Sequence, residues 1–122
     1  NKFPKFINIC LEIEFIDDIK LLFKKVAIIE KKLFRFQTSK NYPRTCDIDI
    51  IDFNGLILTS NKINVLHPRA HKRNFVLFPL KEISPYWVHP KLKLKIGTLI
   101  KKLSLKSRNE ITNVKENAII KK

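Results

Sequence analysis

The chain has 122 residues, 44% of them hydrophobic, which is enough for one modest two-layer domain but not for two independent cores. Its 25 Lys+Arg against 11 Asp+Glu give a formal net charge of +14, which favours an anionic partner such as nucleic acid, acidic lipid or nucleotide phosphate. Because no apolar run reaches the roughly 18 residues of a membrane helix and no signal-peptide layout is present, we expect a soluble, cytoplasmic protein.

The chain opens with two strongly periodic segments. Residues 6–15 alternate strictly and predict a half-buried strand, whose faces carry Ile7, Ile9, Leu11, Ile13 and Phe15 on one side and Phe6, Asn8, Cys10, Glu12 and Glu14 on the other. Asp17 and Asp18 then supply an N-cap, and apolar residues spaced by three and four predict a helix over about 18–34. The apolar stripe of this helix comprises Ile19, Leu22, Phe23, Val26, Ile29 and Leu33.

The middle of the chain is predicted to be a loop followed by a β-hairpin. Residues 36–43 are polar and aperiodic, which is typical of a surface loop. Residues 45–53 are alternating and β-branched, so Cys46, Ile48 and Ile50 are expected to face the core and Asp47 and Asp49 to face away. Asn54-Gly55 is a strong hairpin signal that returns the chain through residues 56–59.

Beyond the hairpin the signals are weaker. Residues 61–71 are predicted to be a loop, and residues 74–84 a short or kinked helix because they contain Pro79. Residues 86–88 form a short extended piece, and residues 96–104 a last helical turn or two. The polar segment 104–122 is expected to be a flexible tail, which leaves 1–103 as the domain.

The two acids of the predicted hairpin are the first candidate site. Side chains two apart on a strand point the same way with Cα atoms about 6.5 to 7 Å apart, so Asp47 and Asp49 could jointly hold Mg²⁺ and recruit nucleotide phosphates. A solvated polar face is the ordinary explanation for such a pair. Arg44 favours the metal–phosphate explanation, because four of the five arginines fall between positions 35 and 73 and arginine suits bidentate phosphate contacts.

The second candidate lies at residues 67–73, whose histidines and arginines could grip a triphosphate, although a basic surface loop explains them equally well. His67 and His71 have the four-residue spacing of helical zinc ligands. Pro68 and the lack of an adjacent acidic residue argue against zinc.

Two smaller features complete the inventory. Phe6 and Asn8 share one face of the first strand and would suit a flat heterocycle, although an edge residue and a surface Asn explain them as well. Cys10 and Cys46 have neither metal-ligand spacing nor a disulfide-rich context, so both are expected to be free thiols.

Three segments, taken in order, carry a family resemblance: KFINICLEIE at 5–14, PRTCDIDI at 43–50 and LHPRAHKRNFVLFPL at 66–80. Together they resemble hydroxymethyldihydropterin pyrophosphokinase of the folate pathway, over about residues 3–103. The resemblance implies an α+β fold, a two-layer sandwich with a ferredoxin-like antiparallel sheet and helices on one face. It also implies an enzyme that moves the β,γ-pyrophosphoryl group of ATP to 6-hydroxymethyl-7,8-dihydropterin, releasing AMP and using two Mg²⁺ ions.

The resemblance assigns roles to residues that match the family motifs. The metal ligands would be Asp47 and Asp49, and together with Arg35 and Arg44, which flank the family's mobile loop, they form the implied catalytic set. The implied substrate contacts are Lys62, His67 and Arg73 for ATP, and Phe6, Asn8 and Phe75 for the pterin. The chain departs from the family pattern at Phe34, at Asn41-Tyr42 and at Leu66.

The family fold opens with a strand, a helix and a strand carrying a Gly-Ser-Asn turn, and none of these precedes Phe3 in this sequence. Without them two strand edges would be unpaired, so we expect this chain alone to be unstable or to aggregate. The whole enzyme is expected to be a monomer that acts on ATP and the pterin and binds neither nucleic acid nor membrane.

Two other functions remain open on the sequence alone. A basic nucleic-acid-binding module would use the Lys-rich surface and aromatic stacking, but Asp47 and Asp49 would then repel phosphate unless Mg²⁺ intervened. A catalytically inactive, truncated remnant would keep the motifs without the activity.

Overall fold

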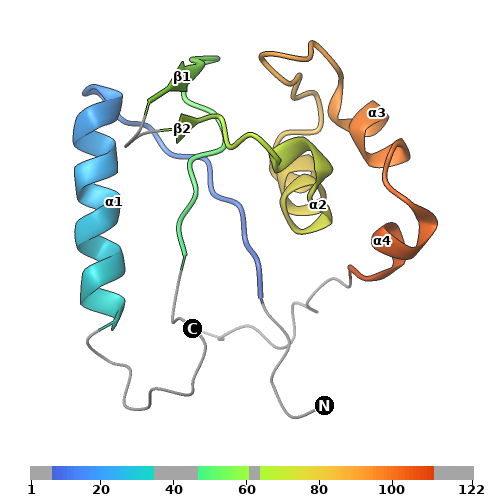
Figure 1. Ribbon diagram of the computed structural model, residues 1–122, viewed down its shortest axis with the longest axis horizontal. Helices are drawn as coiled ribbons and strands as arrows, with labels where there is room; N and C mark the ends of the chain where they lie inside the picture. Colours follow the sequence, from blue (N-terminus) through green and yellow to red (C-terminus); the bar gives the residue numbers. More distant parts are fainter. Residues whose placement is uncertain (1–6, 35–46, 61–63, 112–122) are drawn as a thin grey trace. The chain divides into compact units, whose positions relative to one another are not determined.

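The computed structural model describes residues 7–34, 47–60 and 64–111. Its elements, in chain order, are α1 (Ile19–Phe34), β1 (Leu58–Thr59), β2 (Asn64–Val65), a 3₁₀ helix η1 (Ala70–Lys72), α2 (Asn74–Ile83), α3 (Ile96–Lys101) and α4 (Leu105–Asn109) (Figure 1). The chain divides into two compact units, which we name the α1 unit (13–68) and the α2 unit (1–12 with 69–122).

Helix α1 begins where its capping residue predicts. The Asp18 carboxylate accepts a hydrogen bond from the Leu21 amide at 2.9 Å, and the Asp18 carbonyl accepts one from the Leu22 amide at 3.2 Å. The bond to Leu21 satisfies an amide donor that a helix start otherwise leaves without a partner, and the bond to Leu22 is the first backbone bond of the helix. The predicted helix over 18–34 and its aspartate cap are therefore confirmed.

The core of the α1 unit forms where the first half of α1 meets the β1–β2 ribbon, which lies beside the start of the helix in Figure 1. Ile19, Leu22 and Val65 are buried at its centre, and the partly buried side chains around them are Phe15, Phe23, Val26, Ile50, Phe53 and Leu58. Farther along α1, Ile28 and Ile29 are 53% and 47% exposed. Within the apolar stripe Ile29 is therefore poorly covered, whereas Leu33 beyond it is half-buried.

The predicted turn at Asn54-Gly55 is confirmed. Both residues have positive φ, 52° and 76°, which is the requirement of a type I′ turn. The Leu56 amide closes the turn on the Phe53 carbonyl at 2.9 Å, and the Gly55 amide donates to the Asp52 carboxylate at 2.8 Å.

The strand pairing differs from the prediction. β1 pairs with β2 in antiparallel register, Leu58 opposite Val65 and Thr59 opposite Asn64. Residues 64–65, expected to be loop, are therefore a strand, and residues 47–52 are extended without belonging to a strand. The ladder depends on pairing between the two segments, which the short apolar pattern around Val65 does not reveal.

The first predicted strand is also absent from the described residues, since residues 7–15 have no assigned strand structure. Ile7, Ile9, Leu11 and Ile13 are 64% to 76% exposed, whereas Cys10 on the opposite face is half-buried. The expectation that the isoleucine face is buried is wrong here, because no strand in the described part of the chain pairs with this segment. The α+β class is compatible with these elements, but the sheet they contain is only the β1–β2 ribbon.

The α2 unit has the better-buried core. Helix α2 contains Pro79, as predicted, and packs against η1 and α3. Leu77, Ile96 and Leu99 are at most 1% exposed. A helix of modest length is held here by tertiary burial rather than by its own propensity.

A tight turn precedes α3. Val88 and Lys95 form an isolated β-bridge, which confirms the extended piece predicted at 86–88 for Val88 only, because Tyr86 lies in a turn. His89, only 2% exposed, lies inside this turn, and its Nδ1 accepts hydrogen bonds from the amides of Lys91 at 3.1 Å and Leu92 at 3.0 Å. Because Nδ1 is an acceptor, the proton of the neutral ring lies on Nε2.

Helix α4 forms within the segment 104–122 that the sequence assigns to a tail. Ser104 caps it, since its hydroxyl accepts a hydrogen bond from the Ser107 amide at 3.1 Å. Residues 112–122 lie outside the described residues, so the flexible tail and the 1–103 domain boundary stay predictions.

Candidate active site

The two candidate metal ligands lie on the extended segment that precedes the Asn54-Gly55 turn. Asp47 and Asp49 are exposed, and the intervening Ile48 and the following Ile50 are half-buried, so the predicted alternation of acidic and apolar faces is confirmed. Ile50 packs against the core formed with α1. Burial of the isoleucines on one side therefore directs both carboxylates to solvent on the other, where a hydrated cation can reach them.

A hydrogen bond fixes this segment to α1. The Ile48 amide donates to Glu30 Oε2 at 2.8 Å, across 18 residues of sequence. An amide-to-carboxylate bond is charge-assisted and holds its partners more firmly than a neutral pair does. Glu30 holds the segment that carries the candidate metal ligands, and the sequence reasoning missed it. The signal that could have indicated it is an acidic residue next to the apolar stripe of α1.

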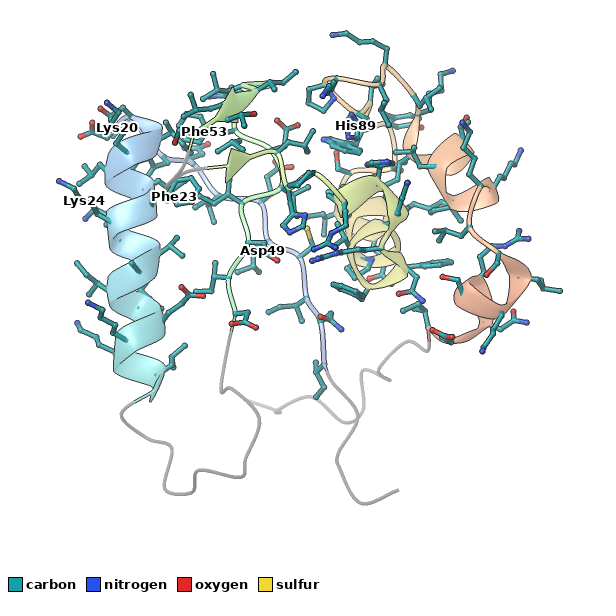
Figure 2. The ribbon with its side chains drawn as sticks, viewed as in Figure 1. Lys20, Phe23, Lys24, Asp49, Phe53 and His89 are labelled. Atoms are coloured by element: carbon teal, nitrogen blue, oxygen red, sulfur yellow. The ribbon has the colours of Figure 1, made fainter. Side chains whose placement is uncertain are left out.

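Aromatic packing supports the same element from the other end. Figure 2 shows Phe23 of α1 on the side of the helix that faces Phe53, whereas Lys20 and Lys24 project from the opposite side. Phe23 and Phe53 both pack against the buried Ile19–Leu22–Val65 cluster. The segment carrying Asp49 is thus held by apolar contacts after it and by the Glu30 bond before it.

The α1 unit contributes one more candidate residue. His67 is half-buried and follows β2 by two residues. Arg35, Arg44 and Lys62 lie outside the described residues, so their assignments to catalysis and ATP binding stay predictions.

The α2 unit brings together two of the predicted substrate contacts. The Arg73 guanidinium carbon lies 5.4 Å from the centroid of the Phe75 ring, within the range of a cation–π interaction. Arg73 is the N-cap residue of α2, and Phe75 is 38% exposed. The pair therefore offers a guanidinium and an aromatic ring at one accessible corner.

Asn74, between them, is a second residue that the sequence reasoning missed. Its side-chain Nδ2 donates to the Ser107 carbonyl at 2.7 Å, which ties the start of α2 to α4. The pattern could not reveal this bond, because its partners are 33 residues apart. Asn8, the predicted pterin amide, is exposed in the same unit, and Phe6 lies outside the described residues.

The chemistry of the acids fits magnesium. Mg²⁺ is commonly held in enzymes by one or two carboxylates together with water and substrate phosphates, rather than by a full protein cage. Within residues 7–34, 47–60 and 64–111, no cluster of three or more His, Cys, Asp or Glu side chains is placed to hold a metal ion. A pair of exposed carboxylates is thus suited to a metal that arrives with its phosphate ligand.

Cys10 is the cysteine that lies in the described part of the chain. Cys10 is a free thiol, as predicted, and burial raises its pKa, with a smaller opposing effect from the Leu11 backbone. A thiol with a raised pKa is a weak nucleophile at neutral pH. Cys46 lies outside the described residues.

No helix in the described part of the chain is both long and apolar enough to cross a membrane.

Comparison with known proteins finds one family model and several curated relatives that this chain resembles. Residues 2–85 match the family model described as 7,8-dihydro-6-hydroxymethylpterin-pyrophosphokinase. The chain is 34% identical over 100 residues to the 2-amino-4-hydroxy-6-hydroxymethyldihydropteridine pyrophosphokinase of Synechocystis sp., covering 82% of this chain and 51% of that protein. It is 37% identical over 79 residues to the enzyme of the same name from Bacillus subtilis, covering 65% of this chain and 47% of that protein.

A longer relative has a broader name. The chain is 39% identical over 93 residues to the Folic acid synthesis protein FOL1 of Dictyostelium discoideum, covering 76% of this chain and 14% of that protein. The chain therefore spans about half the length, or less, of these curated relatives. With more than half of its residues matched by the family model, the chain belongs to the 7,8-dihydro-6-hydroxymethylpterin-pyrophosphokinase family.

Proposed function

We propose that this chain carries the metal–triphosphate site of a hydroxymethyldihydropterin pyrophosphokinase acting in folate biosynthesis. The observation that carries the proposal is the PRTCDIDI segment, whose two acids are exposed and whose isoleucines anchor it to α1, in a chain of this family. The substrates would be ATP and 6-hydroxymethyl-7,8-dihydropterin, and the products AMP and the pterin diphosphate. The protein would act as a monomer in the cytoplasm, on small molecules rather than nucleic acid.

In the proposed reaction the hydroxymethyl oxygen of the pterin attacks the β-phosphorus of ATP. The bond between that phosphorus and the oxygen bridging it to the α-phosphorus breaks, AMP leaves with the bridging oxygen, and the hydroxyl proton passes to solvent. Two Mg²⁺ ions, when bound by Asp47 and Asp49, would supply the positive charge that neutralises the triphosphate. The chain's own contribution would be to fix the two carboxylates through Glu30 and the isoleucine face.

The corner formed by Arg73 and Phe75 would serve the substrates. The guanidinium carries the fixed positive charge that a phosphate needs and lies near one ring. The exposed part of the Phe75 ring would be open to stacking by the pterin. Asn8 would hydrogen-bond the pterin edge, with Phe6, Arg35, Arg44, Lys62 and His67 completing the site as the family resemblance implies.

The two rival functions make different predictions. A nucleic-acid-binding module gains nothing from chelating acids, and family membership favours the pyrophosphokinase over it. An inactive remnant would bind Mg²⁺–ATP through the same acids but make no product.

The test is an assay for AMP and pterin diphosphate with ATP, Mg²⁺ and hydroxymethyldihydropterin, accompanied by calorimetric titration of ATP with and without Mg²⁺. Asp49→Asn is expected to reduce the rate at least about a hundredfold, because it removes a charge that stabilises the metal–phosphate centre. The matched control is Glu82→Gln, which neutralises an exposed acid on α2 and is expected to change the rate less than about twofold. Full activity in Asp49→Asn would disprove the metal assignment, and a wild-type chain that bound neither substrate would contradict the proposal as a whole.

A further inference from the structure

The α2 unit contains a pocket of about 510 Å³ that none of the assignments above uses. It is bounded by η1, by the turn that encloses His89, by α3 and by α4. Its volume lies within the range of about 300 to 1,000 Å³ that is usual for small-molecule sites. The candidate ligands of the proposed reaction, Asp47, Asp49, Arg73, Phe75 and Asn8, are not among its lining residues.

The pocket has an apolar side. Four leucines line it: Leu92 and Leu94 from the turn before α3, Leu99 from α3, and Leu103 just after that helix. Leu99 is 1% exposed and belongs to the buried core of the unit, whereas Leu92 is 40% exposed. These side chains run from the core out to solvent, so an apolar group could be buried against them without opening the core.

The other side of the pocket is cationic. Lys72 of η1 and Lys102 at the end of α3 line it together with His71, and no acidic residue is among the described lining residues. Both lysines are near enough to His71 to affect its ionisation: burial lowers the pKa of this histidine, and the charges of Lys72 and Lys102 lower it further. The lining thus carries two positive charges and no negative one. Such a surface is a favourable environment for an anion.

Edge-to-face ring contacts hold His71 in place in the pocket lining. His71 meets His89 edge to face at 5.4 Å between centroids, and His89 meets Trp87 at 5.7 Å. His89 is fixed by the two amide hydrogen bonds to its Nδ1. His71 Nδ1 is buried and has no hydrogen-bond partner. The imidazole is consequently held by packing rather than by a hydrogen bond at Nδ1. A bound anion would therefore change the pKa of His71.

We propose that this pocket is a binding site for a small organic anion with an apolar body, the leucines taking the body and Lys72 and Lys102 the charged group. The hydroxyl-bearing Ser104 and Ser107 lie on the pocket's α4 side and add polar surface near the anion. The residues that line this pocket are different from those proposed to bind the metal ions, ATP and the pterin. The pocket therefore gives the protein a second place at which a metabolite of this chemistry could bind.

The probe for the test is 8-anilinonaphthalene-1-sulfonate, an aromatic sulfonate whose fluorescence rises in an apolar site, titrated into the full chain. Saturable binding at one site per chain is expected, and Lys102→Gln should weaken the affinity about five- to tenfold by removing one facing charge. The matched control is Lys101→Gln, which removes the same charge from the adjacent exposed position that does not line the pocket, and should change the affinity less than about twofold. The uncharged analogue N-phenyl-1-naphthylamine should bind more weakly than the sulfonate.

A second readout locates the bound anion and does not depend on fluorescence. The imidazole pKa of His71, followed by NMR, should rise on saturation because the sulfonate offsets the lysine charges. Equal loss of affinity in Lys101→Gln and Lys102→Gln would mean that only the overall basic charge attracts the probe. That result, equal binding of the uncharged analogue, or an unchanged His71 pKa would each overturn the proposal. Loss of pyrophosphokinase activity is not an outcome of this test, so its failure and failure of the proposed function are distinguishable.

Discussion

The α2 unit and the α1 unit contrast in how completely their core side chains are buried, although Ile7, Ile9 and Leu11 of the α2 unit are 74% to 76% exposed. In the α2 unit Leu77, Ile96 and Leu99 are all but inaccessible to solvent. In the α1 unit Val65 is 1% exposed, but Ile19 and Leu22 are still 8% exposed and Ile28 and Ile29 of the helix are about half exposed. Since burial of apolar area is the main stabilising term, the α2 unit is closer to a self-sufficient core. The candidate metal ligands are located in the unit with the less complete core.

The largest change in the free energy of unfolding is expected when a leucine of the α2 unit is replaced, and an isoleucine of the α1 unit serves for comparison. Leu77→Ala should lower the free energy of unfolding by about 3 to 4 kcal/mol, because it leaves a cavity at a fully buried position. Ile29→Ala in α1 should cost less than about 1 kcal/mol, because that side chain is already 47% exposed. Urea titration followed by the fluorescence of the single tryptophan, Trp87, and by far-UV circular dichroism measures both. Equal losses in the two variants would show that the cores do not differ.

A second test exchanges the two glycines of the chain for alanine, one in each unit. Gly55→Ala should destabilise by about 1 to 2 kcal/mol, since Gly55 has φ of +76° and a Cβ there meets backbone strain but no neighbouring atom. Gly97→Ala should stabilise by about 0.5 to 1 kcal/mol, because Gly97 is helical and a Cβ there also meets no atom within 4 Å. Thermal melts of both variants give the two signs, and a shift of the same sign in both would contradict this account.

The smallest effect is expected from pH. The pKa of His71 is lowered in the folded chain, first by burial and then by the charges of Lys72 and Lys102. The His89 ring packs against the His71 ring in a T-shaped contact. The unfolded chain therefore takes up the proton first as the pH falls, so stability is lost from about pH 6.5 downward until the folded pKa is passed. His71→Gln should flatten this part of the stability curve, measured as the melting midpoint between about pH 7.5 and 5. An identical slope in wild type and variant would exclude His71 as a contributor.

The features that the sequence predicted correctly all depend on neighbouring residues. Asp18 caps α1 three residues ahead of its partner, Asn54-Gly55 makes its own turn, and the Asp47–Ile50 alternation follows from a period of two. The family resemblance came from three short segments taken in order, at 5–14, 43–50 and 66–80, and the family model confirms it.

The features that it missed depend on contacts between separate segments, some of them distant in the sequence. The isoleucine face of residues 7–13 is exposed. The sequence could not predict this, because alternation shows which side chains share a face but not whether another element covers that face. β2 escaped notice because its two residues acquire strand character only from β1. The Glu30–Ile48 and Asn74–Ser107 bonds and the anion pocket join segments that no short pattern connects.

The Glu30–Ile48 bond also bears on how the chain can vary in length. It joins Ile48, near the start of the described segment 47–60, to the helix that ends at Phe34, with twelve residues, 35–46, between these two parts of the sequence. When both anchors are fixed, the entropy of closing the intervening segment grows only logarithmically, by about 0.6 kcal/mol for each doubling of its length. The Glu30–Ile48 bond therefore keeps the segment that carries Asp47 and Asp49 on α1 by a contact of its own, whatever number of residues connects the two.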